Sequence, residues 1–194
     1  GVHCVVDNAG ALSGTGSITV SGNTVLDNQD GTNAAISLTN ASNVFTGSVT
    51  FTTDSGSNVS FTDTTPLDLQ SGLSINDLTI VAGGAITQSG TLTVAGTSSF
   101  TAGANAITLT QGANDFTGPV SLSNSGTNNV SITDASAIDL GTVGVGQNLS
   151  ITASGAITDS GVATIGGTST FNNSAGSNAA IDLGSASTYT GDVT

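Results

Sequence analysis

One phrase occurs twice in this chain, and the separation of its copies constrains the fold more than any other feature. Residues 84–100 read GAITQSGTLTVAGTSSF, and residues 155–171 read GAITDSGVATIGGTSTF. The copies begin at Gly84 and Gly155, and this separation is the repeat length. Self-similarity at a fixed period of this size is the signature of an array in which each structural unit packs against the next.

A third, more divergent copy begins at Gly10 and reads GALSGTGSITVSGNTVL. Each copy ends on a large apolar residue at the same offset from its first glycine: Leu26, Phe100 and Phe171. A large apolar residue at a fixed phase indicates a side chain that stacks in the core of every unit.

An aromatic–Thr–Gly tripeptide follows each copy and begins at Phe45, Phe116 and Tyr189. Phe45 stands before Gly84 at the same separation as Phe116 before Gly155. The second half of the unit therefore has a constant length. The first half varies by two or three residues, as a loop on one face of a repeat would allow.

These landmarks divide a single solenoid, residues 1–194, into repeat units. We assign the units to residues 10–83, 84–154 and 155–194, the last of them partial, and residues 1–9 to the tail of a preceding unit. We expect adjoining repeats of a longer chain, or other copies of the same chain, to cover the open strand edges at the two ends.

Short apolar triplets fill the units and indicate strands with one buried face. Val, Ile and Leu alternate with small polar residues in LTV, ITL, VSL, VSI and IDL, which is the period-two pattern of a half-buried strand. Gly, Ser, Asn and Asp separate the triplets and supply tight turns. Helical periodicity is absent from the sequence, so we expect an all-β fold.

The fold that combines short strands, tight turns and a repeat is a parallel β-helix, or β-solenoid, in which each strand pairs with its equivalent one coil along. A unit of this length divides into three or four coils of about 18–24 residues, and the chain into about 8–10 coils. We expect a right-handed coil, because crossovers between parallel strands prefer that hand. We also expect the repeated phrase to return at the same phase of the coil. A two-sheet sandwich of the immunoglobulin type is the alternative.

The predicted core consists of the large residues that recur at fixed phases. These are Cys4, Leu26, Phe45, Leu78, Phe100, Phe116, Leu149, Phe171 and Tyr189.

The charge balance excludes several classes of partner. All thirteen acidic residues are Asp, Lys and Arg are absent, and the formal net charge is −13. Binding to nucleic acid needs basic side chains for the phosphates, and docking on anionic lipid needs them as well. We therefore expect no nucleic-acid partner, and no membrane insertion, since no apolar run approaches the length of a span.

The stretch GAITQSGTLTVAGTSSFTAGANAITLTQGANDFTGPVSLSNSGTNNVSITDASAIDL resembles the repeat regions of large secreted bacterial adhesins of the filamentous-haemagglutinin and autotransporter type. The resemblance extends from Gly10 through nearly the whole chain. It implies an extracellular β-helical fibre on the surface of a Gram-negative bacterium that serves attachment, aggregation or matrix building. Carbohydrate or another cell-surface ligand would be its partner. The resemblance implies no catalytic residues.

Parallel β-helices also include polysaccharide lyases and hydrolases. Lyase chemistry on uronates needs a strong base such as Arg or Lys, and hydrolysis needs a pair of carboxylates at a set separation. Asp134 with Asp139, and Asp63 with Asp68, are the candidate pairs. They recur at the same phase in two units, as a structural turn does, so we predict no catalytic site and no enzyme.

Asp27 and Asp30 in the stretch DNQDGTN are weak candidates for Ca²⁺ ligands, because hard cations prefer oxygen donors. The spacing matches neither an EF-hand nor a calcium β-roll, and a solvated Asn/Asp turn is the favoured interpretation. We therefore assign no metal site beyond weak Ca²⁺ binding, and no cofactor.

His3 is the only histidine, and it lacks the second His or Cys pair that a metal site needs. Cys4 falls on the apolar phase that Leu78 and Leu149 occupy, which favours a buried thiol in the core over a covalent link to another chain.

Three functions follow from these observations. The first is an adhesive stalk or fibre segment of a bacterial surface protein. The second is the subunit of an extracellular filament that stacks through uncapped solenoid ends. The third, which the sequence favours least, is a carbohydrate-processing β-helix.

Overall fold

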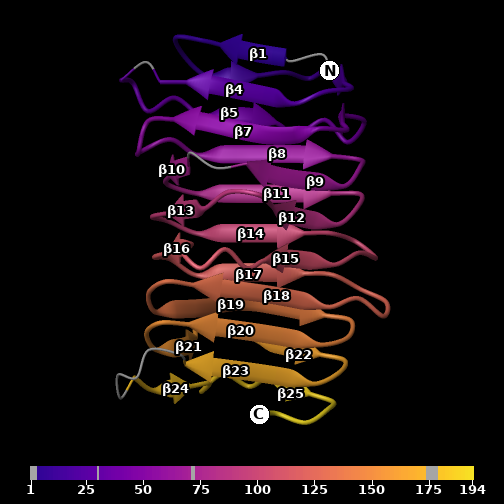
Figure 1. Ribbon diagram of the computed structural model, residues 1–194, viewed down its shortest axis with the longest axis vertical. Coiled ribbons are helices and arrows are strands. Elements are labelled where there is room, and N and C mark those ends of the chain that lie inside the picture. The colour runs from indigo at the N-terminus through magenta and orange to yellow at the C-terminus, as the bar shows by residue number, and fades with distance from the viewer. Residues whose placement is uncertain (1–3, 30, 71–72, 174–178) are drawn as a thin grey trace.

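The computed structural model describes residues 4–29, 31–70, 73–173 and 179–194. These residues form strands joined by turns, and none of them lies in a helix. Strands are stacked as coils along one long axis, with β1 at one end of the rod and β25 near the other (Figure 1). All strand pairings within the described ranges are parallel, which confirms the predicted all-β solenoid of about nine coils.

The strands, in chain order, are β1 (Cys4–Asp7), β2 (Leu12–Ser13), β3 (Thr19–Val20), β4 (Thr24–Asn28), β5 (Ile36–Leu38), β6 (Val44–Phe45), β7 (Ser48–Thr53), β8 (Val59–Asp63), β9 (Leu67–Gln70), β10 (Leu73–Ile75), β11 (Leu78–Ala82), β12 (Ile86–Gln88), β13 (Leu92–Val94), β14 (Ser98–Thr101), β15 (Ile107–Leu109), β16 (Asp115–Phe116), β17 (Val120–Ser123), β18 (Val130–Asp134), β19 (Ile138–Val145), β20 (Leu149–Ala153), β21 (Ile157–Asp159), β22 (Ala163–Ile165), β23 (Ser169–Asn173), β24 (Ile181–Asp182) and β25 (Thr188–Tyr189).

Two long sheets form the walls of the rod. The first wall has the strand order β1-β4-β7-β9-β12-β15-β18-β20-β23, and the second wall has the order β2-β5-β8-β11-β14-β17-β19-β21-β24. Side chains in both walls alternate between buried and partly exposed positions, as in β8 and β20. The buried positions of both walls belong to one hydrophobic core, so the outer faces of the two walls point away from each other.

Short side sheets form the third side of the coils. They are β3–β6, β10–β13–β16, and β22–β25, of which β22 also pairs with the second half of β19. The chain passes from the second wall through β3 to the first wall, but from the first wall through β13 to the second. The third side therefore changes from one edge of the two walls to the other along the rod.

The length of a coil varies along the chain. Thr24 pairs with Val49, whereas Leu67 pairs with Ile86, so the coil that begins at Thr24 is the longer of the two. Extra residues in the longer coils lie in loops between the walls. The loop that joins β4 to β5, for example, lies in the coil that begins at Thr24.

The expectation that the repeated phrase returns at the same phase is wrong. From Ile86 the first wall continues through Ile107 and Val130 to Leu149, which is three coils. The chain then crosses, and Ile157, the counterpart of Ile86, lies in the second wall, where it pairs with Ile138. The repeat does not contain a whole number of coils, so successive copies fall on different walls.

The large residues expected in the core are placed as follows: Leu26, Phe45, Leu78, Phe100, Phe116 and Leu149 are at most 1 % exposed, Phe171 is 7 % exposed, and Cys4 and Tyr189 are partly buried against the same cluster. Aromatic rings from successive coils contact each other. Phe100 packs edge-on against Phe116 with ring centroids 6.1 Å apart, and Phe171 packs in the same way against Tyr189 at 6.2 Å. Aromatic side chains therefore serve the interior of the rod.

Candidate functional site

Hydroxyl side chains form a file along the outer face of the second wall. Each member pairs in register with the next coil, and the file comprises Ser13, Ser37, Ser60, Thr79, Ser99 and Ser121. Neighbouring strands in a sheet lie about 4.8 Å apart, so the hydroxyls repeat at that spacing. The file presents an uncharged, hydrogen-bonding surface.

A shallow groove interrupts this surface where β17 meets β19. The register shifts there, because Val120 pairs with Leu140 while Leu122 pairs with Val143. Thr142 donates its backbone N–H to the Ser121 hydroxyl at 3.2 Å. The groove is lined by Ser99, Phe100, Ser121, Leu122, Ser123, Thr142 and Gly144. It carries no charged side chain among these lining residues.

A second groove lies near the N-terminal end on the same wall. It is lined by Ser13, Gly14, Thr15, Ser37 and Thr39. Both grooves combine hydroxyl groups with glycine backbone, and neither brings together a nucleophile, a base and an orienting group of the kind that catalysis needs.

Two aspartates, Asp63 and Asp134, occupy buried positions at the ends of strands β8 and β18. Asp63 accepts hydrogen bonds from the backbone N–H groups of Phe45 at 3.0 Å and Thr65 at 3.2 Å. Asp134 accepts the N–H of Phe116 at 2.8 Å and that of Ser136 at 2.6 Å. Both aspartates are 1 % exposed.

Burial raises the pKa of both carboxyls above the ordinary value of 3.8, because desolvation outweighs the hydrogen bonds that favour the charged form. Repulsion from Asp115 adds to the rise of the Asp134 pKa. The Ser136 hydroxyl lies between these two carboxylates, 3.0 Å from Asp115 and 2.9 Å from Asp134. The sequence offers no Lys or Arg that could compensate these charges.

The proposed carboxylate pairs do not share a site. Asp134 occupies a buried position of β18, whereas Asp139 occupies the outward position between buried Ile138 and Leu140 of β19. In the other unit Asp68 is likewise outward on β9, and its Oδ2 accepts the Ser89 hydroxyl at 2.8 Å. In each pair, therefore, one aspartate faces the core and the other faces outward.

A buried asparagine, Asn114, links three coils at the end of the side sheet β10–β13–β16. Asn114 accepts the N–H of Leu92 at 3.0 Å and donates to the carbonyls of Leu109 and Thr133, both at 3.2 Å. These partners lie in three successive coils. Asn114 also exchanges two hydrogen bonds of 2.8 Å with the Gln88 amide.

Asn43 has the same arrangement one repeat earlier in the chain. It accepts the N–H of Ile18 at 2.9 Å and donates to the carbonyls of Leu38 and Thr62 at 3.1 and 3.2 Å. In the third unit the Ser187 hydroxyl takes the same position and accepts the N–H of Ala163 at 2.8 Å. A small polar side chain at this position is therefore part of the repeat.

The recurrence of Asp63 and Asp134 predicts a structural turn, but it predicts neither their burial nor the role of Asn43 and Asn114. A signal for them was present, because Asn43 precedes Asp63 at the same separation as Asn114 precedes Asp134. Both pairs enclose an aromatic–Thr–Gly tripeptide. Their separation equals one coil, which identifies residues that meet between neighbouring coils.

Of the two candidate Ca²⁺ ligands, the structure describes only Asp27. Asp30 lies outside the described residues, and Asp27 accepts the N–H of Gln29 at 3.2 Å in a local turn. The loop instead donates the N–H groups of Gly31 and Asn33 to the Asp54 carboxylate, at 2.8 and 3.4 Å. The N–H groups of the loop thus point toward this carboxylate, whereas a bound cation would need oxygen ligands from the loop.

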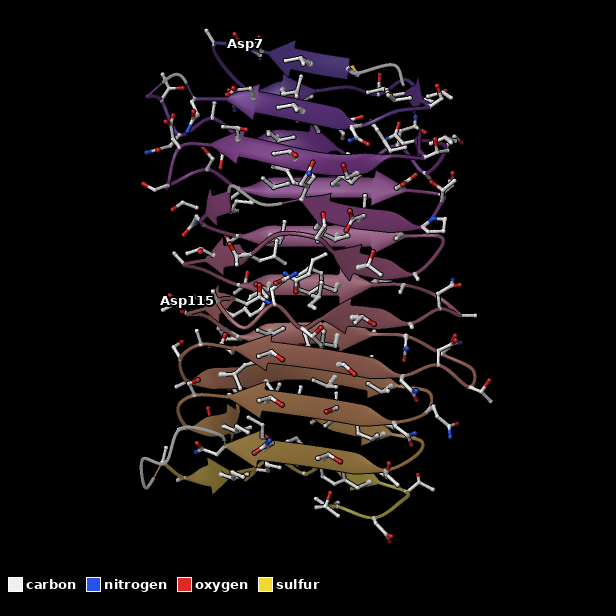
Figure 2. The ribbon with its side chains drawn as sticks, in the orientation of Figure 1. Asp7 and Asp115 are labelled. Atoms are coloured by element: carbon white, nitrogen blue, oxygen red, sulfur yellow. The ribbon has the colours of Figure 1, made fainter. Side chains whose placement is uncertain are left out.

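Acidic side chains are spread along the rod. Asp7 lies near the N-terminal end and Asp115 near the middle (Figure 2). Within the described ranges no group of three or more His, Cys, Asp or Glu side chains is close enough together to hold a metal ion. His3 is outside these ranges, and Cys4 is a free, half-buried thiol whose strand pairs with β4.

Parallel coils, one continuous core and an internal repeat define this chain as a β-solenoid repeat protein. It belongs to the family described as repeats of unknown function (DUF5649), whose model matches residues 4–52, 56–123 and 127–194. The last two matches begin at residues 56 and 127, the same separation as that of Gly84 from Gly155. Neither the curated proteins nor the solved structures contain a significant match.

In the described part of the chain, no helix is long and apolar enough to cross a membrane.

Proposed function

We propose that this chain is a segment of an extracellular β-solenoid stalk or fibre that mediates attachment, aggregation or matrix formation at a bacterial surface. The observation that carries the proposal is the pair of walls that run through the whole described rod. Each coil is joined to the next by parallel strand pairing on both walls, which makes a stiff spacer whose stability adds up coil by coil. The resemblance of the repeats to those of secreted adhesins supports the same role.

The outer surface suits contact with a polar ligand. Its hydroxyl file and two uncharged grooves offer hydrogen bonds, and the aromatic side chains remain in the core. We propose carbohydrate or another polar cell-surface ligand as the partner. The role we propose is structural and adhesive, with no catalytic step and no cofactor.

Beads coated with the purified chain test this function. They should attach to surfaces coated with dextran, alginate or collagen, or clump with one another, more strongly than beads coated with albumin, which is also acidic. Equal behaviour of the two kinds of bead on all these surfaces and in suspension would overturn the proposal.

A filament subunit is the second candidate. The first and last described coils expose apolar side chains, with Val5 65 % exposed, Ile181 46 % and Val193 52 %. Open strand edges beside apolar groups favour pairing with another chain. Electron microscopy of the purified chain separates the two candidates, since long fibres of uniform width support the filament and monodisperse short rods contradict it.

A further inference from the structure

We infer that each repeat turns the displayed surface by about half a turn, so that the rod presents the same repeat-encoded surface on two opposite sides and acts as a two-sided cross-linker. This inference rests on the proposed attachment function for its biological meaning. Its geometry rests only on the strand pairing and on a device that ends each side sheet.

The device consists of a buried asparagine and a buried aspartate. In the side sheet β10–β13–β16, the next coil supplies no further strand, and its residues 134–136 pass over β16 as a corner. The Asp134 carboxylate accepts the N–H of Phe116, and Asn114 donates to the carbonyl of Thr133 in the covering coil. These side chains satisfy backbone groups that a further strand would otherwise have paired.

The same device ends the side sheet β3–β6. The Asp63 carboxylate accepts the N–H of Phe45, and Asn43 donates to the carbonyl of Thr62. After each end, a new side sheet begins at the other edge of the walls: β10 follows Asp63, and the second half of β19, which pairs with β22, follows Asp134. One device per repeat therefore moves the third side from one edge to the other.

The outcome is visible in residues that correspond between repeats. Thr87 lies outward on β12 of the first wall, and its counterpart Thr158, one repeat later, lies on β21 of the second wall. Their hydroxyls donate to corresponding carbonyls, Leu67 at 3.4 Å and Ile138 at 3.5 Å. The local surroundings are thus repeated, while the direction in which they face is reversed.

The first copy of the phrase along the chain, which begins at Gly10, also supports the alternation. Ser13 of the first copy lies on the second wall, like Thr158 of the last copy. Ser99 and Thr170 also correspond, and they lie on the second and first walls respectively. Any ligand-binding surface that the repeat encodes would face one side in one copy and the opposite side in the next. Such a rod joins two copies of its ligand.

The test places two biotins on the rod. In a Cys4→Ala background, Thr87→Cys with Thr158→Cys labels corresponding residues, and Thr87→Cys with Ser150→Cys is the matched control on one wall. In the control, the two positions are three coils apart on the first wall, about 14 Å at the spacing of neighbouring strands. When the biotins are attached through short linkers, two streptavidin molecules clash at that distance.

With monovalent streptavidin, native mass spectrometry should find two streptavidins per chain for the Thr87/Thr158 pair and one for the control pair. One streptavidin per chain for both pairs would overturn the inference. If a variant fails to fold by circular dichroism, Ser99→Cys with Thr170→Cys replaces it and carries the same expectation. This measurement needs no natural ligand. A rod that binds two streptavidins while coated beads do not attach would leave the geometry intact and refute the proposed function.

Discussion

Asp63 and Asp134 show how a carboxylate is accommodated in a core whose sequence has no basic side chain to pair with it. Each replaces a missing backbone acceptor and receives N–H groups from its own turn and from the coil below. Hydrogen bonds to a charged acceptor are strong, yet burial still raises the pKa of both groups. The device that shapes the repeat is therefore sensitive to pH.

The sign of this dependence is opposite to ordinary acid denaturation. Because the native pKa of Asp63 and Asp134 lies above 3.8, the folded chain holds these protons more tightly than the unfolded chain does. Their contribution to stability is complete below about pH 3.8 and is lost as the pH rises through the elevated native pKa. Urea unfolding between pH 3 and pH 8 should show stability increasing toward acid. Asp134→Asn should flatten this dependence, whereas outward Asp139→Asn should flatten it less. Equal slopes in the two variants would contradict this assignment.

Three buried hydroxyls recur at one phase of the repeat, at Thr24, Ser98 and Ser169. Their oxygens have no hydrogen-bond partner among the described residues. A buried hydroxyl without a partner costs about 1–3 kcal/mol of desolvation. Ser98→Ala should therefore raise the free energy of unfolding by about 1 kcal/mol in urea titrations. The control Ser99→Ala, on the outer face of the same strand, should change it by less than about 0.5 kcal/mol. A loss of stability in Ser98→Ala would refute this account.

At the scale of elements, the glycine of each aromatic–Thr–Gly tripeptide lets one coil approach the next. A Cβ atom at Gly118 would overlap the backbone of Gly96, and one at Gly47 would overlap the backbone of Gly22. The corresponding Gly191 lies in the same way against Gly167. The tripeptide thus combines a core aromatic with a close contact between backbones.

Gly118→Ala should destabilise the chain, because the neighbour that must move is backbone rather than a flexible side chain. Overpacking of this kind costs about 1–3 kcal/mol. Gly112→Ala is the control, since a Cβ there meets nothing within 4 Å. Thermal unfolding of the two variants measures the difference. A melting temperature for Gly118→Ala equal to that of Gly112→Ala would show that the coils can separate without cost.

The strands were predictable from the sequence, whereas their assignment to walls was not. Triplets such as Ile107–Leu109 carry their own period-two pattern, which is a local property. The wall on which a triplet lies depends on how many residues every earlier coil contains, and that number varies between loops. The period of the repeat was visible, but the number of coils within it was not.

The same contrast between local signals and features that depend on distant residues applies to the candidate site. Asp27 and Asp30 stood out because they lie in a polar stretch, which is a local signal, and the loop proved to bind the distant Asp54. The recurrence of Asp63 and Asp134 at a fixed phase predicts a turn residue. Asp63 is buried because the coil that covers β6 has no side strand there, so its carboxylate accepts the N–H of Phe45 instead. No short stretch of sequence encodes this absence.

For the whole molecule, the charge balance predicts an unusual response to salt. Thirteen Asp residues meet no Lys or Arg, so the interactions between charged side chains are almost entirely repulsive. Screening by salt should stabilise the fold, and the melting temperature should rise by a few degrees between about 10 mM and 0.5 M NaCl at pH 7. At pH 3, where carboxyls are mostly neutral, the rise should largely disappear. A fall in melting temperature with salt at pH 7 would contradict this view.

The alternation of walls also bears on how such a chain avoids misfolding. Arrays of similar segments risk pairing with the wrong neighbour while they fold. Here residues 84–100 cannot take the place of residues 155–171 by slipping through whole coils, because the copies belong to different walls. A one-residue slip would in turn expose the buried face of each strand. Similar segments therefore take distinct positions along the rod. The half-turn between repeats limits incorrect strand pairing in a sequence of low complexity.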